Sequence, residues 1–87
     1  MQQLNYRIIL TPEPEGGFTV VVPSLQGCVT YGKTLNEAIS MAKEAISGYL
    51  EVLNDMGEPI PDDSHSFEYS LTLPFNTPNV QNTFTNI

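Results

Sequence analysis

The 87-residue chain contains few of the side chains that carry chemistry: one cysteine, one histidine and no tryptophan. A single cysteine, Cys28, cannot form an internal disulfide, so nothing indicates an oxidising compartment. The N-terminus lacks the basic start and apolar run of a signal peptide. No apolar run approaches the about 18 residues that a membrane-spanning helix needs. We therefore expect a cytoplasmic protein with no membrane association.

Positive charge is also scarce. Three basic residues, Arg7, Lys33 and Lys43, stand against ten acidic ones, which gives a formal net charge of −7. Nucleic-acid backbones are held by clustered Lys and Arg, so direct nucleic-acid binding is not expected. Opposite charges speed protein association, so the composition suits a basic protein partner. The alternative is that the acidity serves only solubility.

The residues that could support catalysis do not form a motif. His65 and Cys28 are the only imidazole and thiol, and neither has a base or nucleophile at a suitable spacing. One His and one Cys do not make a zinc site. Asp62 and Asp63 beside His65 are more typical of a solvated turn than of a cation site. Two-metal nucleases need several clustered carboxylates, which the chain does not offer. We predict no catalytic residue, no metal, no cofactor and no enzymatic activity.

Alternation of apolar and polar side chains predicts four strands, over residues 4–11, 18–22, 28–31 and 66–73. The Pro- and Gly-rich loop 12–17 joins the first two as an antiparallel hairpin. Pro23 and Pro74 end the second and fourth strands. The fourth strand has the most regular alternation, with one apolar face formed by Phe67, Tyr69, Leu71 and Leu73.

One helix is predicted between the third and fourth strands. The sequence TLNE, beginning at Thr34, is a capping box, in which the Thr34 side chain accepts from the Glu37 N–H and the Glu37 carboxylate reaches back. The helix is expected to end at Asp55 or Met56, since Gly57 suits the position after a helix. One apolar stripe should pack on the sheet; it consists of Leu35, Ala38, Ile39, Ala42, Ile46, Tyr49, Leu50 and Leu53. A second stripe needs cover from the C-terminal tail, a second subunit or another protein; it consists of Met41, Ala45, Gly48 and Val52.

These elements predict a single α+β domain of order βββαβ. A right-handed crossover through the helix brings the fourth strand beside the first, which gives a mixed four-stranded sheet of order 3-2-1-4 with the helix on one face.

The ordered motifs resemble the HicB family of antitoxins. The stretch 20–32 reads V-x-x-P-x-L-x-G-C-x-T-x-G, after a hairpin with two glycines before Phe18, and it continues into the helix and then GEPIP at 57–61. Ser24 and Gln26 depart from the usual family loop, where Asp and Pro are common. The resemblance implies a truncated ribonuclease H-like fold without catalysis over residues 1–74. Residues 75–87 then form a tail or arm, and no DNA-binding domain is expected.

The resemblance also implies a function. HicB proteins neutralise a basic, mRNA-cleaving HicA-type toxin by direct binding, so a HicA-like toxin is the expected partner. A homodimer or higher homo-oligomer is also expected, because a chain of this size has a thin core and its second helix stripe needs cover. The alternative is a solitary HicB-like oligomeric interaction module without a toxin. We predict that the partner-binding residues lie on the outer side of the helix; they are Met41, Glu44, Glu51, Val52 and Asp55. The alternative is that the acidic side chains are only solvated and that the apolar stripe is internal or lies in a dimer.

Overall fold

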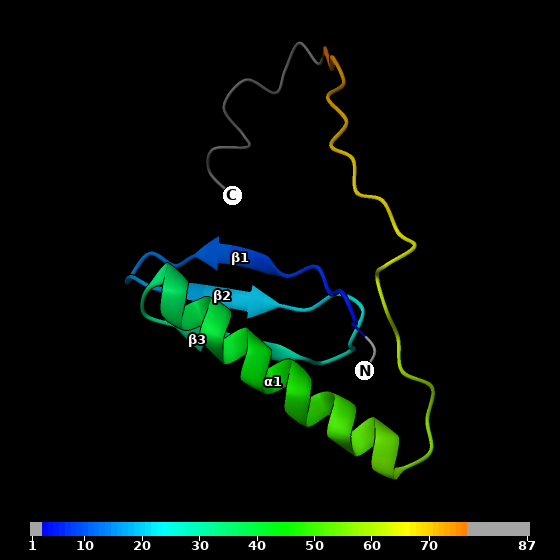
Figure 1. The fold of residues 1–87 in the computed structure, drawn as a ribbon. Helices are drawn as coiled ribbons and strands as arrows, with labels where there is room; N and C mark the ends of the chain where they lie inside the picture. Colours follow the sequence, from blue (N-terminus) through cyan, green and yellow to red (C-terminus); the bar gives the residue numbers. More distant parts are fainter. Residues whose placement is uncertain (1–2, 77–87) are drawn as a thin grey trace.

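The computed structural model describes residues 3–76 and has an α+β architecture (Figure 1). Three strands are followed by one helix of 21 residues: β1 (Ile9–Pro12), β2 (Phe18–Val21), β3 (Val29–Gly32) and α1 (Leu35–Asp55). The order of the elements up to the end of the helix is therefore the predicted one. Within residues 3–76, no helix is both long and apolar enough to cross a membrane.

The strands form one antiparallel sheet of order β1-β2-β3. The β1–β2 turn closes through two backbone bonds, from the Gly16 N–H to the Glu13 carbonyl and from the Glu13 N–H to the Gly17 carbonyl, both 2.9 Å. Gly16 and Gly17 have φ angles of 107° and 82°, a region that side chains disfavour. These two glycines make the tight hairpin possible.

The helix begins and ends where the sequence predicts. The Thr34 hydroxyl accepts from the Glu37 N–H at 3.1 Å. The Glu37 carboxylate accepts from the Lys33 N–H at 2.6 Å and not from Thr34, so the reciprocal half of the predicted capping box is displaced by one residue. Gly57, with a φ of 72°, follows the helix, and the Glu58 N–H bonds to the Leu53 carbonyl at 2.9 Å.

The helix packs on one face of the sheet around two small buried clusters. One contains Val20, Ala38 and Ala42; the other contains Val22, Leu25 and Cys28. At Gly32 the two layers approach so closely that an added Cβ would lie 2.3 Å from the Ala38 backbone nitrogen. The small residues at this contact therefore set the distance between helix and sheet.

The predicted fourth strand is not formed. Residues 66–73 have no strand structure in the described part of the chain, and their apolar side chains are exposed. The place beside β1, where the order 3-2-1-4 puts this strand, is therefore unfilled by residues 3–76. The Ser66 N–H bonds to the Asp63 carbonyl at 3.0 Å in a turn before this segment, and the Glu68 carboxylate after it lies 3.9 Å from the Arg7 guanidinium.

The first strand is also shorter than the predicted range of 4–11. If the β1–β2 register continued toward the N-terminus, residue 7 would lie opposite Pro23. Pro23 has no N–H, so it cannot donate the backbone hydrogen bond that would extend the β1–β2 ladder. Residues 5–7 instead bond to the loop after the helix, so β1 begins only at Ile9.

Candidate functional site

Helix α1 is much longer than the sheet that it covers. Its 21 residues span roughly 31 Å at 1.5 Å per residue. The four residues of each strand span only about 13 Å. The C-terminal half of α1 consequently projects beyond the strands (Figure 1). Side chains on the last turns have no sheet beneath them.

All the residues predicted to bind a partner lie on this helix. At 100° per residue they fall within an arc of about 100° that is centred away from the buried Ala38 and Ala42. Met41 is half-buried on the flank, Val52 is 56% exposed, and the three carboxylate residues are exposed. The structure therefore places the predicted set on one accessible side, which we call the outer helix face; it consists of Met41, Glu44, Glu51, Val52 and Asp55.

An apolar hollow adjoins the outer helix face at the end of the helix. It is lined by Tyr49, Val52, Leu53 and Met56. The prediction assigned Tyr49 and Leu53 to the stripe that packs on the sheet, and it did not include Met56, which is 64% exposed. The sequence does not predict this hollow, because the predicted strands 4–11 and 66–73 would span about 26 Å each, nearly the length of the helix. The overhang appears because β1 has only four residues and the fourth strand is not formed among residues 3–76.

The middle of the helix is held firmly by the β2–β3 loop. Leu25 is buried in the loop, and Ile46, Tyr49 and Leu50 pack against its cluster. The Tyr49 hydroxyl donates to the Gln26 carbonyl at 2.7 Å. The end of α1 that extends beyond the sheet therefore follows directly after a part of the helix that is packed against the β2–β3 loop.

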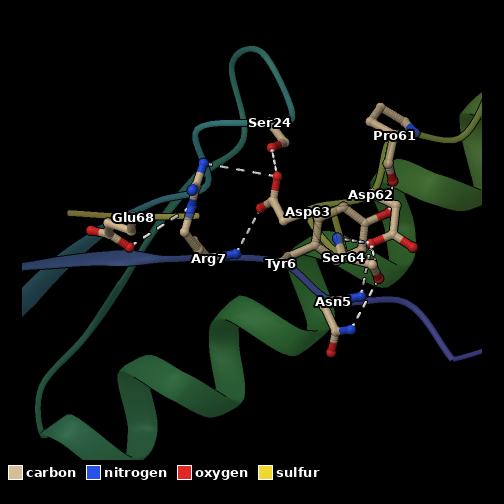
Figure 2. A network of polar contacts seen from close by, with 9 residues as sticks. All are labelled: Asn5, Tyr6, Arg7, Ser24, Pro61, Asp62, Asp63, Ser64 and Glu68. Atoms are coloured by element: carbon tan, nitrogen blue, oxygen red, sulfur yellow. Dashed lines mark hydrogen bonds and ion pairs between the residues drawn. The ribbon is translucent and has the colours of Figure 1, made fainter. Parts of the chain in front are cut away.

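The loop after the helix is held by a buried carboxylate, Asp63 (Figure 2). This carboxylate accepts from the Arg7 backbone N–H at 2.8 Å and from the Ser24 hydroxyl, and the Arg7 guanidinium lies 3.9 Å away. The Asp63 N–H donates to the Asn5 carbonyl at 2.9 Å. Asp63 thus lies at the end of the β1–β2 ladder, where its carboxylate accepts from the Arg7 N–H and its own N–H donates to the Asn5 carbonyl.

A second set of contacts fastens the same loop to the N-terminal segment. The Asp62 carboxylate accepts from the Ser64 N–H and hydroxyl, both at 2.7 Å, and from the Asn5 N–H at 3.3 Å. The Tyr6 hydroxyl donates to the Pro61 carbonyl. Residues 61–64 are therefore tied to residues 5–7 by side-chain and backbone bonds together (Figure 2).

These hydrogen bonds favour the charged forms of both carboxylates. The bond from the Ser24 hydroxyl, followed by that from the Arg7 N–H, lowers the pKa of Asp63 below its ordinary value. The bond from the Ser64 hydroxyl lowers the pKa of Asp62. The prediction of a solvated turn was therefore wrong for Asp63. No local pattern could have found it, because its partners lie 39 and 56 positions away in the chain.

The reactive side chains are placed without partners for catalysis. Cys28 is buried, and burial raises the pKa of its thiol, which disfavours the nucleophilic thiolate. Among residues 3–76, no group of three His, Cys, Asp or Glu side chains is arranged to hold a metal ion. The described surface offers contacts, with charge on the outer helix face and apolar area beside it.

Comparison with known proteins gives a consistent family. A family model described as "HicB_like antitoxin of bacterial toxin-antitoxin system" matches residues 6–82. A UPF0150 protein of Thermoplasma acidophilum is 44% identical over 61 residues, which cover 70% of this chain and 88% of that protein. A UPF0150 protein of Synechocystis is 39% identical over 62 residues, which cover 71% and 78%.

The family also includes proteins named as antitoxins. Antitoxin HicB of Escherichia coli K12 is 30% identical over 73 residues, which cover 82% of this chain and 53% of the antitoxin. The chain therefore matches about half the length of that relative. From the family model and these relatives, the chain belongs to the HicB-like antitoxin family, whose members are not enzymes.

Proposed function

We propose that this chain is an antitoxin that neutralises a basic, mRNA-cleaving HicA-type toxin by binding it directly. The observation that carries the proposal is the outer helix face, an accessible and acidic surface on a member of an antitoxin family. An RNA-cleaving protein needs cationic side chains to hold phosphates. A negatively charged protein surface can occupy those side chains and exclude RNA.

The position of the acidic residues supports a role in binding. Glu51 and Asp55 lie in the last turns of α1, and no basic residue stands in its last turn. The C-terminal end of a helix carries partial negative charge, so a carboxylate in the last turn, as at Asp55, destabilises it by roughly 0.3–1 kcal/mol. Stability of the fold therefore does not explain Asp55, whereas a cationic partner would.

The apolar hollow completes the proposed surface. Protein interfaces combine an apolar centre with a polar rim, and aromatic residues and Met are enriched at the centre. Val52 and Met56 would supply the centre beside Tyr49, and the carboxylates of the outer helix face would supply the rim. On this view Met41 contributes at the edge of the contact.

The proposal is tested by co-expression with a HicA-type toxin encoded beside this gene. We expect the chain to restore growth, to co-purify with the toxin, and to suppress cleavage of RNA by the purified toxin. Continued growth arrest, with the chain present in excess and no complex formed, would contradict the proposal.

A matched pair of charge reversals locates the contact. Glu51→Lys on the outer helix face should weaken toxin binding by roughly 3–10-fold and reduce the salt dependence of association, as for a charge at an interface rim. Glu15→Lys changes the charge equally on the exposed β1–β2 turn and should have little effect. Equal effects of the two substitutions would indicate that only net charge matters, and the outer helix face would then not be the contact.

A solitary HicB-like oligomeric module is the second candidate. The exposed apolar side chains after residue 66 favour it, because they indicate a contact other than the acidic helix face. This alternative predicts self-association with no toxin gene nearby. A chain that assembles and still binds and inhibits an adjacent toxin would exclude it as the sole function.

A further inference from the structure

The segment after the pinned loop exposes an unusual amount of apolar surface. Five alternate side chains between residues 67 and 75 are 76–97% exposed: Phe67, Tyr69, Leu71, Leu73 and Phe75. The intervening residues 68, 70 and 72 are polar, which is the pattern of a strand with one buried face. Contiguous exposed apolar patches on monomers usually mark interaction sites. We call this stretch the apolar segment 67–75.

The contacts of the preceding loop fix where this segment begins. Asp62 and Asp63 fasten the loop to residues 5–7, and a bond from the Ser66 N–H to the Asp63 carbonyl closes a turn just before the segment. The segment starts beside its own β1, where the Glu68 carboxylate lies 3.9 Å from the Arg7 guanidinium. Farther along, the chain runs well past the three strands, so its own sheet leaves the segment exposed (Figure 1).

The same molecule carries a surface that suits such a segment. β1 is an edge strand, and edge strands present unpaired backbone groups to any strand that approaches. The sheet face opposite the helix exposes a cross-strand row of Ile9, Val21 and Val29. A strand added at β1 would pair with its edge and extend this apolar row.

The segment starts close to that edge. Phe67 and Tyr69 line a shallow hollow together with Arg7, Ile9 and Pro23, at the N-terminal end of β1. The emerging strand and the receiving edge therefore lie side by side on one chain. Two copies related by a two-fold axis near this point would each donate a segment and each receive one.

We infer that the apolar segment 67–75 of one chain adds as a strand to the β1 edge of a second copy, and that the exchange is reciprocal. Aromatic side chains bury roughly 150–250 Å² each, so the aromatic rings of two segments alone supply on the order of 1,000 Å², near the lower limit of stable interfaces. Within 66–76 the only charged residue is Glu68, so the contact brings few carboxylates of the two acidic chains together.

The charge of the segment also separates it from the proposed toxin site. A basic toxin is attracted to carboxylates, three of which lie on the outer helix face, whereas residues 66–76 contain only Glu68. The apolar segment 67–75 is nearly neutral and alternates apolar and polar side chains, so it suits the β1 edge of a second copy of this chain instead. The inference is independent of toxin binding, because every measurement below uses the purified full chain alone.

The first test compares two substitutions on opposite faces of the segment. By light scattering at micromolar concentration, the full chain should have twice its monomer mass of 9.6 kDa. Leu71→Asp should raise the dimer dissociation constant by roughly a hundredfold or more, since the change occurs twice per dimer. Thr72→Asp adds the same charge on the polar face and should leave the dimer intact. Far-ultraviolet circular dichroism checks that both variants keep α1.

The second test identifies the contact directly. A photo-crosslinking residue, Tyr69→p-benzoylphenylalanine, is placed in a mixture of ¹⁴N- and ¹⁵N-labelled chains, and the crosslinked peptides are read by mass spectrometry. The inference expects mixed-label peptides that join residue 69 to β1. A monomeric full chain, crosslinks to β1 that are exclusively same-label, or equal dissociation by Leu71→Asp and Thr72→Asp would each overturn it. A monomer that still neutralises a toxin would overturn the exchange and leave the proposed function standing.

Discussion

Residues 8–46 and residues 52–76 differ in how their apolar side chains are covered. The first group, which we call the packed region, contains both buried clusters, with Val20 and Ala38 fully inaccessible. The second, the open region, exposes most of its large apolar side chains, among them Val52, Met56 and Phe75, although Asp63 within it is buried. A chain of this size buries a limited fraction of its surface. Its own core stabilises the hairpins and the first half of α1, and the remaining apolar surface is available for contact.

The largest expected effect breaks the packed region at its closest contact. In Gly32→Ala, the added Cβ would lie 2.3 Å and 2.4 Å from the Ala38 nitrogen and Cα, which are backbone atoms that cannot move aside locally. We expect the free energy of unfolding to fall by about 2–3 kcal/mol, measured by urea denaturation.

Gly48→Ala is the matched control, because nothing lies within 4 Å of the added methyl group. Removing a helical glycine should raise stability by roughly 0.5–1 kcal/mol. Similar destabilisation by both substitutions would show that the tight packing is not confined to the packed region.

The next effect concerns the link between the two regions. Asp63→Asn removes the charged acceptor of the Ser24 hydroxyl and the Arg7 N–H. We expect it to lower the free energy of unfolding less than Gly32→Ala does. It should lower this free energy more than Asp62→Asn, a substitution of the exposed neighbouring residue. Urea denaturation of the three variants at pH 7 gives this order. If Asp62→Asn lowered the free energy of unfolding more than Asp63→Asn, Asp63 would not be the main link between the packed region and the open region.

The same residue predicts a pH dependence. The folded-state pKa of Asp63 is lowered, so its contribution to stability is fully present above the ordinary pKa of about 3.9 and is lost as the pH falls through the lower folded value. The wild-type chain should therefore lose more stability on acidification below pH about 4 than Asp63→Asn does. Denaturation midpoints of both, measured from neutral to acidic pH, check this; parallel curves would contradict it.

A smaller effect is expected from a substitution at the start of the helix, which leaves the open region unchanged. Thr34→Ala removes the side chain that accepts from the Glu37 N–H and should cost about 1 kcal/mol of stability. Toxin affinity, measured below the unfolding transition, should stay unchanged. A loss of affinity comparable to that of Glu51→Lys would mean that binding depends on the packed end of the helix.

The smallest expected effect is that of a substitution in the open region that raises stability and weakens toxin binding. Asp55→Lys places a positive charge near the negative end of α1 and should stabilise the fold by a few tenths of a kcal/mol, up to about 1 kcal/mol. It should nevertheless weaken binding of a basic toxin. Thermal unfolding and titration calorimetry measure the two quantities, and a gain in both would place the toxin contact elsewhere.

The elements of the packed region could be predicted from sequence because their signals are local. Thr34 and Gly57 bound α1, and the glycines at 16 and 17 with their neighbouring prolines define the first hairpin. The positions on the outer helix face followed from helical periodicity alone, and the structure leaves them accessible. Their role in binding remains a prediction.

The open region could not be predicted in the same way. The alternation of residues 66–73 is a valid strand signal, but periodicity does not specify which edge a strand joins, or in which chain. The buried Asp63 depends on Arg7 and Ser24, which no local window includes. The hollow at Met56 arises because the helix is longer than the sheet. This difference depends on the observed lengths of both elements, so the pattern of neither element alone predicts it.

By itself, the sequence determined the order of the three strands and the helix, both ends of α1 and the acidic charge along its outer side, because these depend on neighbours within a few residues. Only the tertiary structure decided that Asp63 is buried, that α1 overhangs the sheet and that the apolar segment 67–75 is left exposed. Each of these depends on contacts between residues distant in the chain, as where the Arg7 backbone N–H finds its acceptor in the Asp63 carboxylate.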